Sequence, residues 1–402
     1  LYEPPADKAA WDFLTRTTHP ALTATETAAY LQGDQSVAPA AQRWTTLEPL
    51  SRKHYRLETR ARDLLERMLA AKINRAQGIF LPDPFSPQHG VVQADGTPDE
   101  LLLPWRTTAT LLGGAEYLGS IHLPGGSVNH LFRRDQQAIM VLWNDRPTQE
   151  TLFLGEQIEH FDLWGRTIPH ATVDQDGAPT QQLSIGRLPS FVTGLSLPIA
   201  QWRIRFAFET THLPSVFGKD QLAKFTFINT FAQSVGGEVR VHPPLNWEVT
   251  PLATNFRAAA GEPRQESFQV RFKSEAESGR QLLRFDLTLT ADHDYRFSVY
   301  QPIHVGLDDV TIETSTRLND EGQLIVEQVI NNRTDEFVSF NCLLFAPGRR
   351  RERLQVLELG RGRHVSSFVL PRGEELIGQP LQLRAEEMNG DRVLNYQVLP
   401  VE

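Results

Sequence analysis

The sequence predicts a multidomain, mainly β protein in which an N-terminal α/β region is followed by three β-sandwich modules. Three observations lead to this prediction. The chain has 402 residues, which is more than one compact core usually holds. Its apolar residues recur with a helical period up to residue 116 and with a period of two afterwards. Turn residues separate the short apolar runs of this second part, as they do in β-sandwiches.

Residues 1–116 carry most of the helical signal. In 55–74 apolar residues recur at steps of three and four, which predicts an amphipathic helix. A short strand is expected at 78–81, where two prolines close it, and a second helix from 100 to 115. The order helix, strand, loop, helix is that of an α/β unit.

The remaining modules are predicted from period-two patterns. Residues 117–198 form a small β module. Its expected strands are 138–143, 181–185 and 191–193. A boundary is expected at Pro198, followed by a strand from Trp202 to Phe208. Residues 199–304 and 305–402 are predicted to be two sandwiches of about a hundred residues each.

A weak internal repeat links these last two modules. A strand at 225–230 contains Asn229 at a turn and is followed by a strand at 238–241 and two prolines. Further along, a strand at 325–332 ends in Asn332 and is followed by a strand at 338–345 and a proline. Duplication of a sandwich and chance similarity between two hairpins both explain the pattern.

Composition narrows the classes of function. The formal net charge of -9 disfavours general affinity for nucleic acid. No apolar stretch reaches the roughly 18 residues that a membrane-spanning helix needs. P-loop, Rossmann, HExxH, GxSxG and EF-hand motifs are absent from the sequence. We therefore expect no nucleic-acid partner, no membrane span and no cofactor, whereas glycoside hydrolysis, which leaves no compact motif, stays possible.

The single cysteine, Cys342, has two consequences. It excludes an intramolecular disulfide and a zinc site built from several cysteines. It also lies within the apolar run 340–345, so we expect a buried and inert thiol.

Three side chains are candidates for a functional site. Glu26 closes a run that fits a strand or a helix, so it is either a strand-end carboxylate or a surface glutamate. Asp83 and His89 follow the expected strand at 78–81 and would lie at the same strand end. Their alternative interpretation is that of turn residues between prolines.

Two further features are less specific. Six arginines between Arg349 and Arg363 form the densest group of charges. They either grip an anionic polysaccharide through guanidinium donors or form a solvated, salt-bridged face. The run Asn332-Arg333-Thr334 matches the glycosylation sequon by pattern alone.

Several short runs resemble those of clan A glycoside hydrolases. Residues 78–80, 95–98 and 111–114 resemble the last strand, loop and helix of their (β/α)8 barrel. The runs 141–145, 161–166 and 188–192 resemble the small β-sandwich that closes such barrels. Residues 199–304 resemble the immunoglobulin-like modules of the type associated with α-galactosidases. The resemblance implies that 1–116 is the C-terminal portion of a (β/α)8 barrel, followed by the closing sandwich at 117–198 and two immunoglobulin-like sandwiches.

The same resemblance implies a function. The chain would be the C-terminal fragment of a retaining glycoside hydrolase acting on poly- or oligosaccharide, extracellular or periplasmic. Glu26 would be the nucleophile, Asp83 and His89 would bind substrate, and the acid/base residue would lie upstream of Leu1. The implied partners are a carbohydrate and the missing barrel segment or a partner chain. The alternative is a non-catalytic carbohydrate-binding or cell-surface structural module with a degenerate barrel.

Overall fold

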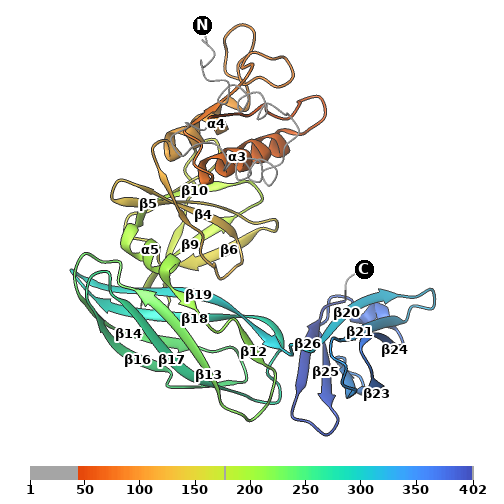
Figure 1. Cartoon of the computed structure of the whole chain (residues 1–402). Helices are drawn as coiled ribbons and strands as arrows, with labels where there is room; N and C mark the ends of the chain where they lie inside the picture. Colours follow the sequence, from red (N-terminus) through yellow and green to blue (C-terminus); the bar gives the residue numbers. More distant parts are fainter. Residues whose placement is uncertain (1–43, 176–177, 401–402) are drawn as a thin grey trace. The chain divides into compact units, whose positions relative to one another are not determined.

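A computed structural model describes residues 44–175 and 178–400, and within them the chain is mainly β-strand (Figure 1). The chain divides into two compact units, unit 1 at Leu1–Ile204 and unit 2 at Arg205–Glu402. The mainly β, multi-sheet character that the sequence predicts is confirmed. The finer limits of the four expected modules stay predictions.

The first described part of unit 1 is a small α/β layer. Its elements are β1 (Trp44–Thr46), α3 (Leu57–Ile73), β2 (Gly78–Phe80) and α4 (Leu102–Leu112). β1 and β2 pair in parallel, with α3 between them in the sequence. α3 buries Ala61, Leu64 and Met68 on one face, because its apolar residues recur at steps of three and four. The expected order of helix, strand and helix is therefore confirmed here.

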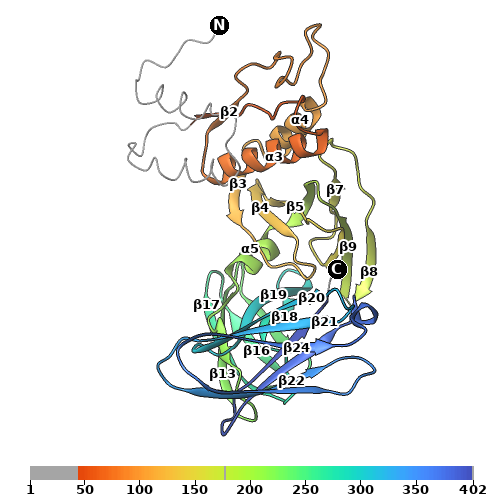
Figure 2. The same ribbon diagram turned by 90° about the vertical axis from the view of Figure 1, so that its right-hand side faces the viewer.

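A five-stranded sheet lies against this layer. Its strands, in spatial order, are β3 (Glu116–Gly119), β4 (Val128–Arg134), β5 (Gln137–Trp143), β10 (Ser190–Ser196) and β7 (Glu159–Phe161). Ile139 and Val141 of β5 belong to the same core cluster as Met68 of α3, and Figure 2 shows α3 running along this sheet. Met140 and Leu142 pack on the opposite side. All but the first residue of β5 is buried, because both faces of the sheet are covered.

A three-stranded sheet and one helix complete unit 1. They are β6 (Thr148–Leu152), β9 (Ala178–Ile185) and β8 (Ala171–Gln175), in spatial order, and α5 (Leu197–Arg205). The prediction of a strand from Trp202 to Phe208 is therefore wrong for residues 202–205, which belong to α5. An alternating Trp-Arg-Ile-Arg-Phe run fits either structure. The helix forms because it buries apolar side chains on one face. Ile199 and Trp202, three residues apart, are both fully buried there.

Unit 2 begins with a β-sandwich, which we call the first sandwich. One sheet has the order β11 (Ala207–Phe208), β13 (Gln221–Ile228), β17 (Pro263–Phe272) and β15 (Trp247–Thr250). The other has the order β12 (His212–Pro214), β19 (Asp294–Gly306), β18 (Gly279–Thr290), β14 (Val235–His242) and β16 (Ala253–Ala258). Phe225 of one sheet packs on Phe285 of the other, with 5.2 Å between ring centroids. Aromatic side chains thus fill the space between the sheets.

The second sandwich is smaller. Its sheets have the orders β20 (Val310–Leu318), β21 (Leu324–Asn332), β24 (Gly362–Leu370) and β23 (Glu352–Leu359), β22 (Val338–Phe345), β25 (Leu381–Glu387), β26 (Val393–Val398). A 3-10 helix, η1 (Gly373–Leu376), follows β24. Cys342 lies fully buried in the core between these sheets, and burial raises the pKa of its thiol to about 11. The expectation of a buried thiol is confirmed, whereas its lack of reactivity stays a prediction that the raised pKa favours.

The two sandwiches share one order of strands. In one sheet, the spatial order β11-β13-β17 of the first sandwich corresponds to β20-β21-β24 of the second. In the other sheet, β19-β18-β14-β16 corresponds to β26-β25-β22-β23. The similarity seen in the sequence therefore extends beyond two isolated hairpins.

The asparagines of the repeat make matching contacts. Asn229 is 1 % exposed; its Nδ2 donates to Gln233 O at 2.8 Å, and its Oδ1 accepts from Phe231 N at 3.0 Å. Asn332 is also 1 % exposed; its Nδ2 donates to Glu336 O at 2.7 Å, and its Oδ1 accepts from Thr334 N at 3.0 Å. Each side chain thus holds the turn after its strand. Because both polar atoms of Asn332 are buried and bonded, the folded sequon does not offer an accessible amide.

The expected (β/α)8-barrel portion is wrong, and so is the resemblance to clan A glycoside hydrolases. Such a barrel alternates eight parallel strands with helices. Within residues 44–175 and 178–400 there are three α-helices, and the α/β layer has one parallel pair of three-residue strands. The runs behind the resemblance reflect local turn chemistry. Asp162 Oδ1 accepts from Trp164 N and Arg166 N, and Gly165 has φ 83°, as a turn in many folds requires.

Candidate functional site

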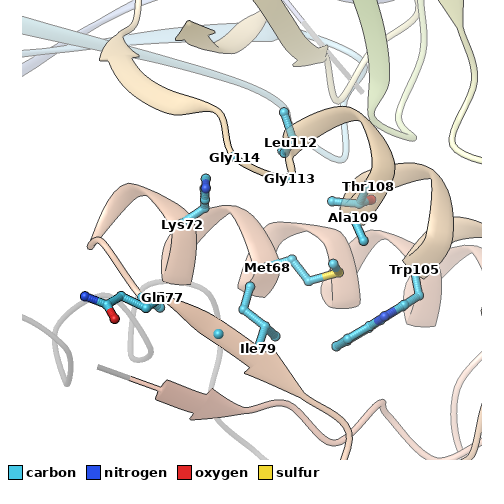
Figure 3. A pocket seen from close by; sticks show the side chains of 12 residues that line it. Met68, Lys72, Gln77, Ile79, Trp105, Thr108, Ala109, Leu112, Gly113 and Gly114 are labelled. Atoms are coloured by element: carbon cyan, nitrogen blue, oxygen red, sulfur yellow. The ribbon is translucent and has the colours of Figure 1, made fainter. Parts of the chain in front are cut away.

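One cavity lies in the α/β layer of unit 1, between α3, α4 and β2 (Figure 3). Its volume is about 220 Å³, and Met68, Ile79 and Trp105 line it together. Of its polar groups, Thr108 Oγ1 is already bonded to Pro104 O at 2.8 Å. Burial lowers the pKa of Lys72 at the cavity wall. This lining suits an apolar group and offers few donors or acceptors to a polyhydroxylated ligand.

A second cavity lies within unit 2, where the two sandwiches join, and we call it the joint cleft. Its volume is about 250 Å³. β25 and β26 supply a row of planar polar side chains, which are Gln382, Arg384, Asn395 and Gln397. Glu275 and Glu277 of the first sandwich also line the cleft, as do Phe345 and Tyr396 of the second.

The period of β-strands explains why polar groups gather on β25 and β26. Leu381 and Leu383 alternate with Gln382 and Arg384, so the leucines face the core while the polar side chains face outward. Gln382 pairs with Gln397 across the strands, and Arg384 pairs with Asn395. Four outward-facing polar side chains therefore form two adjacent cross-strand pairs.

Backbone and side-chain hydrogen bonds hold the two sandwiches together beside the cleft. Asn395 Nδ2 donates to Ser274 O at 3.0 Å and to Ala276 O at 2.8 Å. Ser278 N donates to Asn395 O at 2.7 Å, and Val393 N donates to Ser215 O at 3.1 Å. These bonds position segment 274–278 against β26, so the cleft is formed in advance of any ligand.

Several polar groups of the cleft are free to bind a ligand. Among the residues that the structure describes, the amides of Gln382 and Gln397 have no hydrogen-bond partner. The same is true of the Glu277 carboxylate and the two terminal nitrogens of Arg384. Donors and acceptors that converge on one cavity without partners are the feature expected of a binding site.

The aromatic side chains of the cleft differ in their availability. Phe345 is 36 % exposed, so its ring is accessible at the cleft. The hydroxyl of Tyr396 bonds to the backbone of Ile312, and burial raises the pKa of Tyr396. Trp143 and Trp247 are 7 % and 6 % exposed, so these two rings are not available for stacking.

The sequence-derived site residues are not part of the joint cleft. Glu26 lies outside the described residues. Asp83 Oδ1 accepts from Phe85 N at 3.2 Å, and His89 Nδ1 lies 2.7 Å from Pro49 O. The Asp83 contact is that of a turn residue, whereas His89 contacts a residue 40 positions earlier in the chain. The role of Asp83 and His89 in substrate binding stays a prediction.

The arginines between Arg349 and Arg363 are largely paired with neighbouring groups. Arg349 contacts Glu375 at 3.1 Å, and Arg361 contacts Asp335 at 3.2 Å. Arg353 Nε donates to Asn341 Oδ1 at 2.6 Å. These contacts favour the interpretation of a solvated, salt-bridged face over an anion-binding surface.

No protein-family model and no curated protein matches the chain. Similar solved structures include Escherichia coli alpha-2-macroglobulin activated by porcine elastase (10% identity, TM-score 0.30, 71% of this chain and 30% of that one). They also include a DUF4785 family protein from Legionella pneumophila (11%, 0.23, 70% and 97%) and red sea bream transglutaminase (12%, 0.22, 48% and 31%). The chain thus spans less than a third of the transglutaminase and macroglobulin chains. None of the three is described as a glycoside hydrolase, and TM-scores this low carry no argument about function.

None of the helices in residues 44–175 and 178–400 combines the length and apolarity that a membrane-spanning helix needs. In the same residues, no three His, Cys, Asp or Glu side chains gather in a group that could hold a metal ion.

Proposed function

We propose that the chain is a non-catalytic carbohydrate-binding module of an extracellular or periplasmic protein, and that the joint cleft binds the sugar. The observation that supports this proposal best is that the amides of Gln382 and Gln397 and the terminal nitrogens of Arg384 have no hydrogen-bond partner among the described residues. Neighbouring sugar hydroxyls each donate and accept hydrogen bonds, which suits amide and guanidinium groups with several donors and acceptors.

The aromatic ring at the cleft supports the same ligand class. One face of a sugar ring carries C–H groups, and such a face packs on an accessible aromatic ring. Phe345 offers such a ring beside Gln382, its cross-strand partner. The hydrolytic expectation rested on the barrel resemblance, which is overturned, so we base the proposal on binding alone.

Replacing Gln382 and Gln397 together by alanine should weaken binding without unfolding the chain. Both side chains are exposed, and neither makes a side-chain hydrogen bond within residues 44–175 and 178–400. Two lost hydrogen bonds of about 1 kcal/mol each correspond to an affinity about 30-fold lower. The measurement is a glycan-array screen of the full chain, followed by titration calorimetry with the best-bound glycan.

Gln355→Ala is the matched control for this experiment. Gln355 is an exposed glutamine on β23 of the same sheet and does not line the cleft. We expect this variant to bind like the unaltered chain. The proposal would be contradicted if the unaltered chain bound no glycan on the array. It would also be contradicted if the Q382A/Q397A variant bound the glycan as tightly as the unaltered chain does.

A further inference from the structure

We propose that the joint cleft selects its sugar by charge, preferring a residue with a free amino group over a neutral one and excluding uronic acids and sulfated sugars. This inference rests on the proposed function and names the ligand class within it. It follows from the arrangement of three charged side chains, Glu275, Glu277 and Arg384, around the cavity.

The cleft carries two carboxylates against one guanidinium. Glu275 and Glu277 both come from the first sandwich and are exposed at the cavity. The carboxylate of Glu277 has no partner among the described residues. Ser274 Oγ donates to Glu275 Oε1 at 2.5 Å, which lowers the pKa of that carboxyl and keeps it ionised at neutral pH. A cationic group in the cavity therefore meets favourable charge, whereas an anionic group meets repulsion.

Arg384 does not offset this preference. Its Nε lies 2.7 Å from Glu386 Oε1, so a carboxylate of its own strand already neutralises its charge. Arg384 also interacts electrostatically with Glu275 across the cleft. Its terminal nitrogens can still donate to hydroxyl oxygens, but an anionic sugar would have to compete with these two carboxylates. The role of Arg384 is therefore to donate hydrogen bonds to the hydroxyl oxygens of the sugar.

The test uses oligomers of glucosamine, N-acetylglucosamine and glucuronic acid with the full chain. At low ionic strength we expect the glucosamine oligomer to bind about fivefold more tightly than the N-acetylated one, and the glucuronic acid oligomer not to bind. Glu277→Gln should remove most of the difference between the first two. Because the charges are exposed, the difference should also shrink at high salt.

Glu156→Gln serves as the matched control, since it removes one exposed negative charge from unit 1. It should leave the order of affinities unchanged. Equal or tighter binding of the glucuronic acid oligomer, or an order unaffected by E277Q, overturns the charge selection while the proposed function stands. Binding of no glycan in the panel or the array overturns both.

Discussion

Replacing Asn332 by alanine is expected to lower the free energy of unfolding of unit 2 by about 3 kcal/mol, because four hydrogen bonds at a buried site lose one partner. Asn332 Nδ2 donates to Glu336 O and Leu359 O, and its Oδ1 accepts from Thr334 N and Thr334 Oγ1. Alanine leaves these groups buried without partners. The measurement is urea unfolding of the full chain, with hydrogen exchange in β21 and β22 to assign the transition.

Asn229→Ala tests the equivalent side-chain hydrogen bonds in the first sandwich. Asn229 Nδ2 donates to Gln233 O, Ala258 O and Ala259 O, so a loss of similar size is expected in the first sandwich. Asn255→Ala is the control, because Asn255 is exposed on β16 and its side chain makes no hydrogen bond to any residue that the structure describes. The effect of this variant should stay below about 0.5 kcal/mol. If the N229A and N332A variants lose no more free energy of unfolding than the N255A control, the hydrogen bonds of Asn229 and Asn332 do not stabilise the sandwiches.

Unit 1 is expected to lose stability as the pH falls from 6.5 to 4. Burial, with a smaller contribution from His170, lowers the pKa of His160 from its ordinary 6.5 to about 4. The unfolded chain therefore binds a proton at a higher pH than the folded chain does. Stability is fully present above pH 6.5 and falls until pH 4, by about 3 kcal/mol from this residue.

The surroundings of His160 explain why its charged form is disfavoured. The side chain is fully buried, and its Nε2 lies 2.9 Å from Ser190 Oγ, which itself can donate to Leu142 O at 3.3 Å. Nδ1 is buried without a hydrogen-bond partner among the described residues. A second proton would sit at this atom with no acceptor.

The pH dependence can be isolated with two variants. His160→Gln keeps an amide donor near Ser190 but cannot titrate, so its pH profile should lose the part of the slope that His160 causes. His54→Gln replaces an exposed histidine of the same unit and should keep the full slope. Tryptophan fluorescence during urea unfolding follows unit 1, because every tryptophan except Trp247 lies in it. Identical slopes in the unaltered and H160Q chains would refute this explanation.

Local sequence patterns predicted the elements and much of the core. The helix expected at 55–74 is observed at Leu57–Ile73, because its apolar residues have one spacing that only a helix can bury. Cys342 lies in the apolar run 340–345 and is buried, as expected. The strand predicted from Trp202 is a helix as far as Arg205, because alternating residues can also form a helical face once tertiary packing covers them.

Local sequence patterns could not predict the joint cleft. The alternation in 381–386 indicates that Gln382 and Arg384 face outward, but it does not reveal what lies opposite. Segment 274–278 is held there by Asn395, more than a hundred residues further along the chain. The barrel resemblance failed for a related reason, since short turn motifs report local geometry and not the order of elements.

Hydrogen exchange with and without the best-bound glycan tests the central claim most directly. The claim places the sugar at the joint cleft, so bound glycan should slow exchange in β25, β26 and residues 274–278 of the full chain. The cavity beside α3 and α4 should show no change. Protection at that cavity, or unchanged exchange across β25 and β26 at saturating glycan, would contradict the claim.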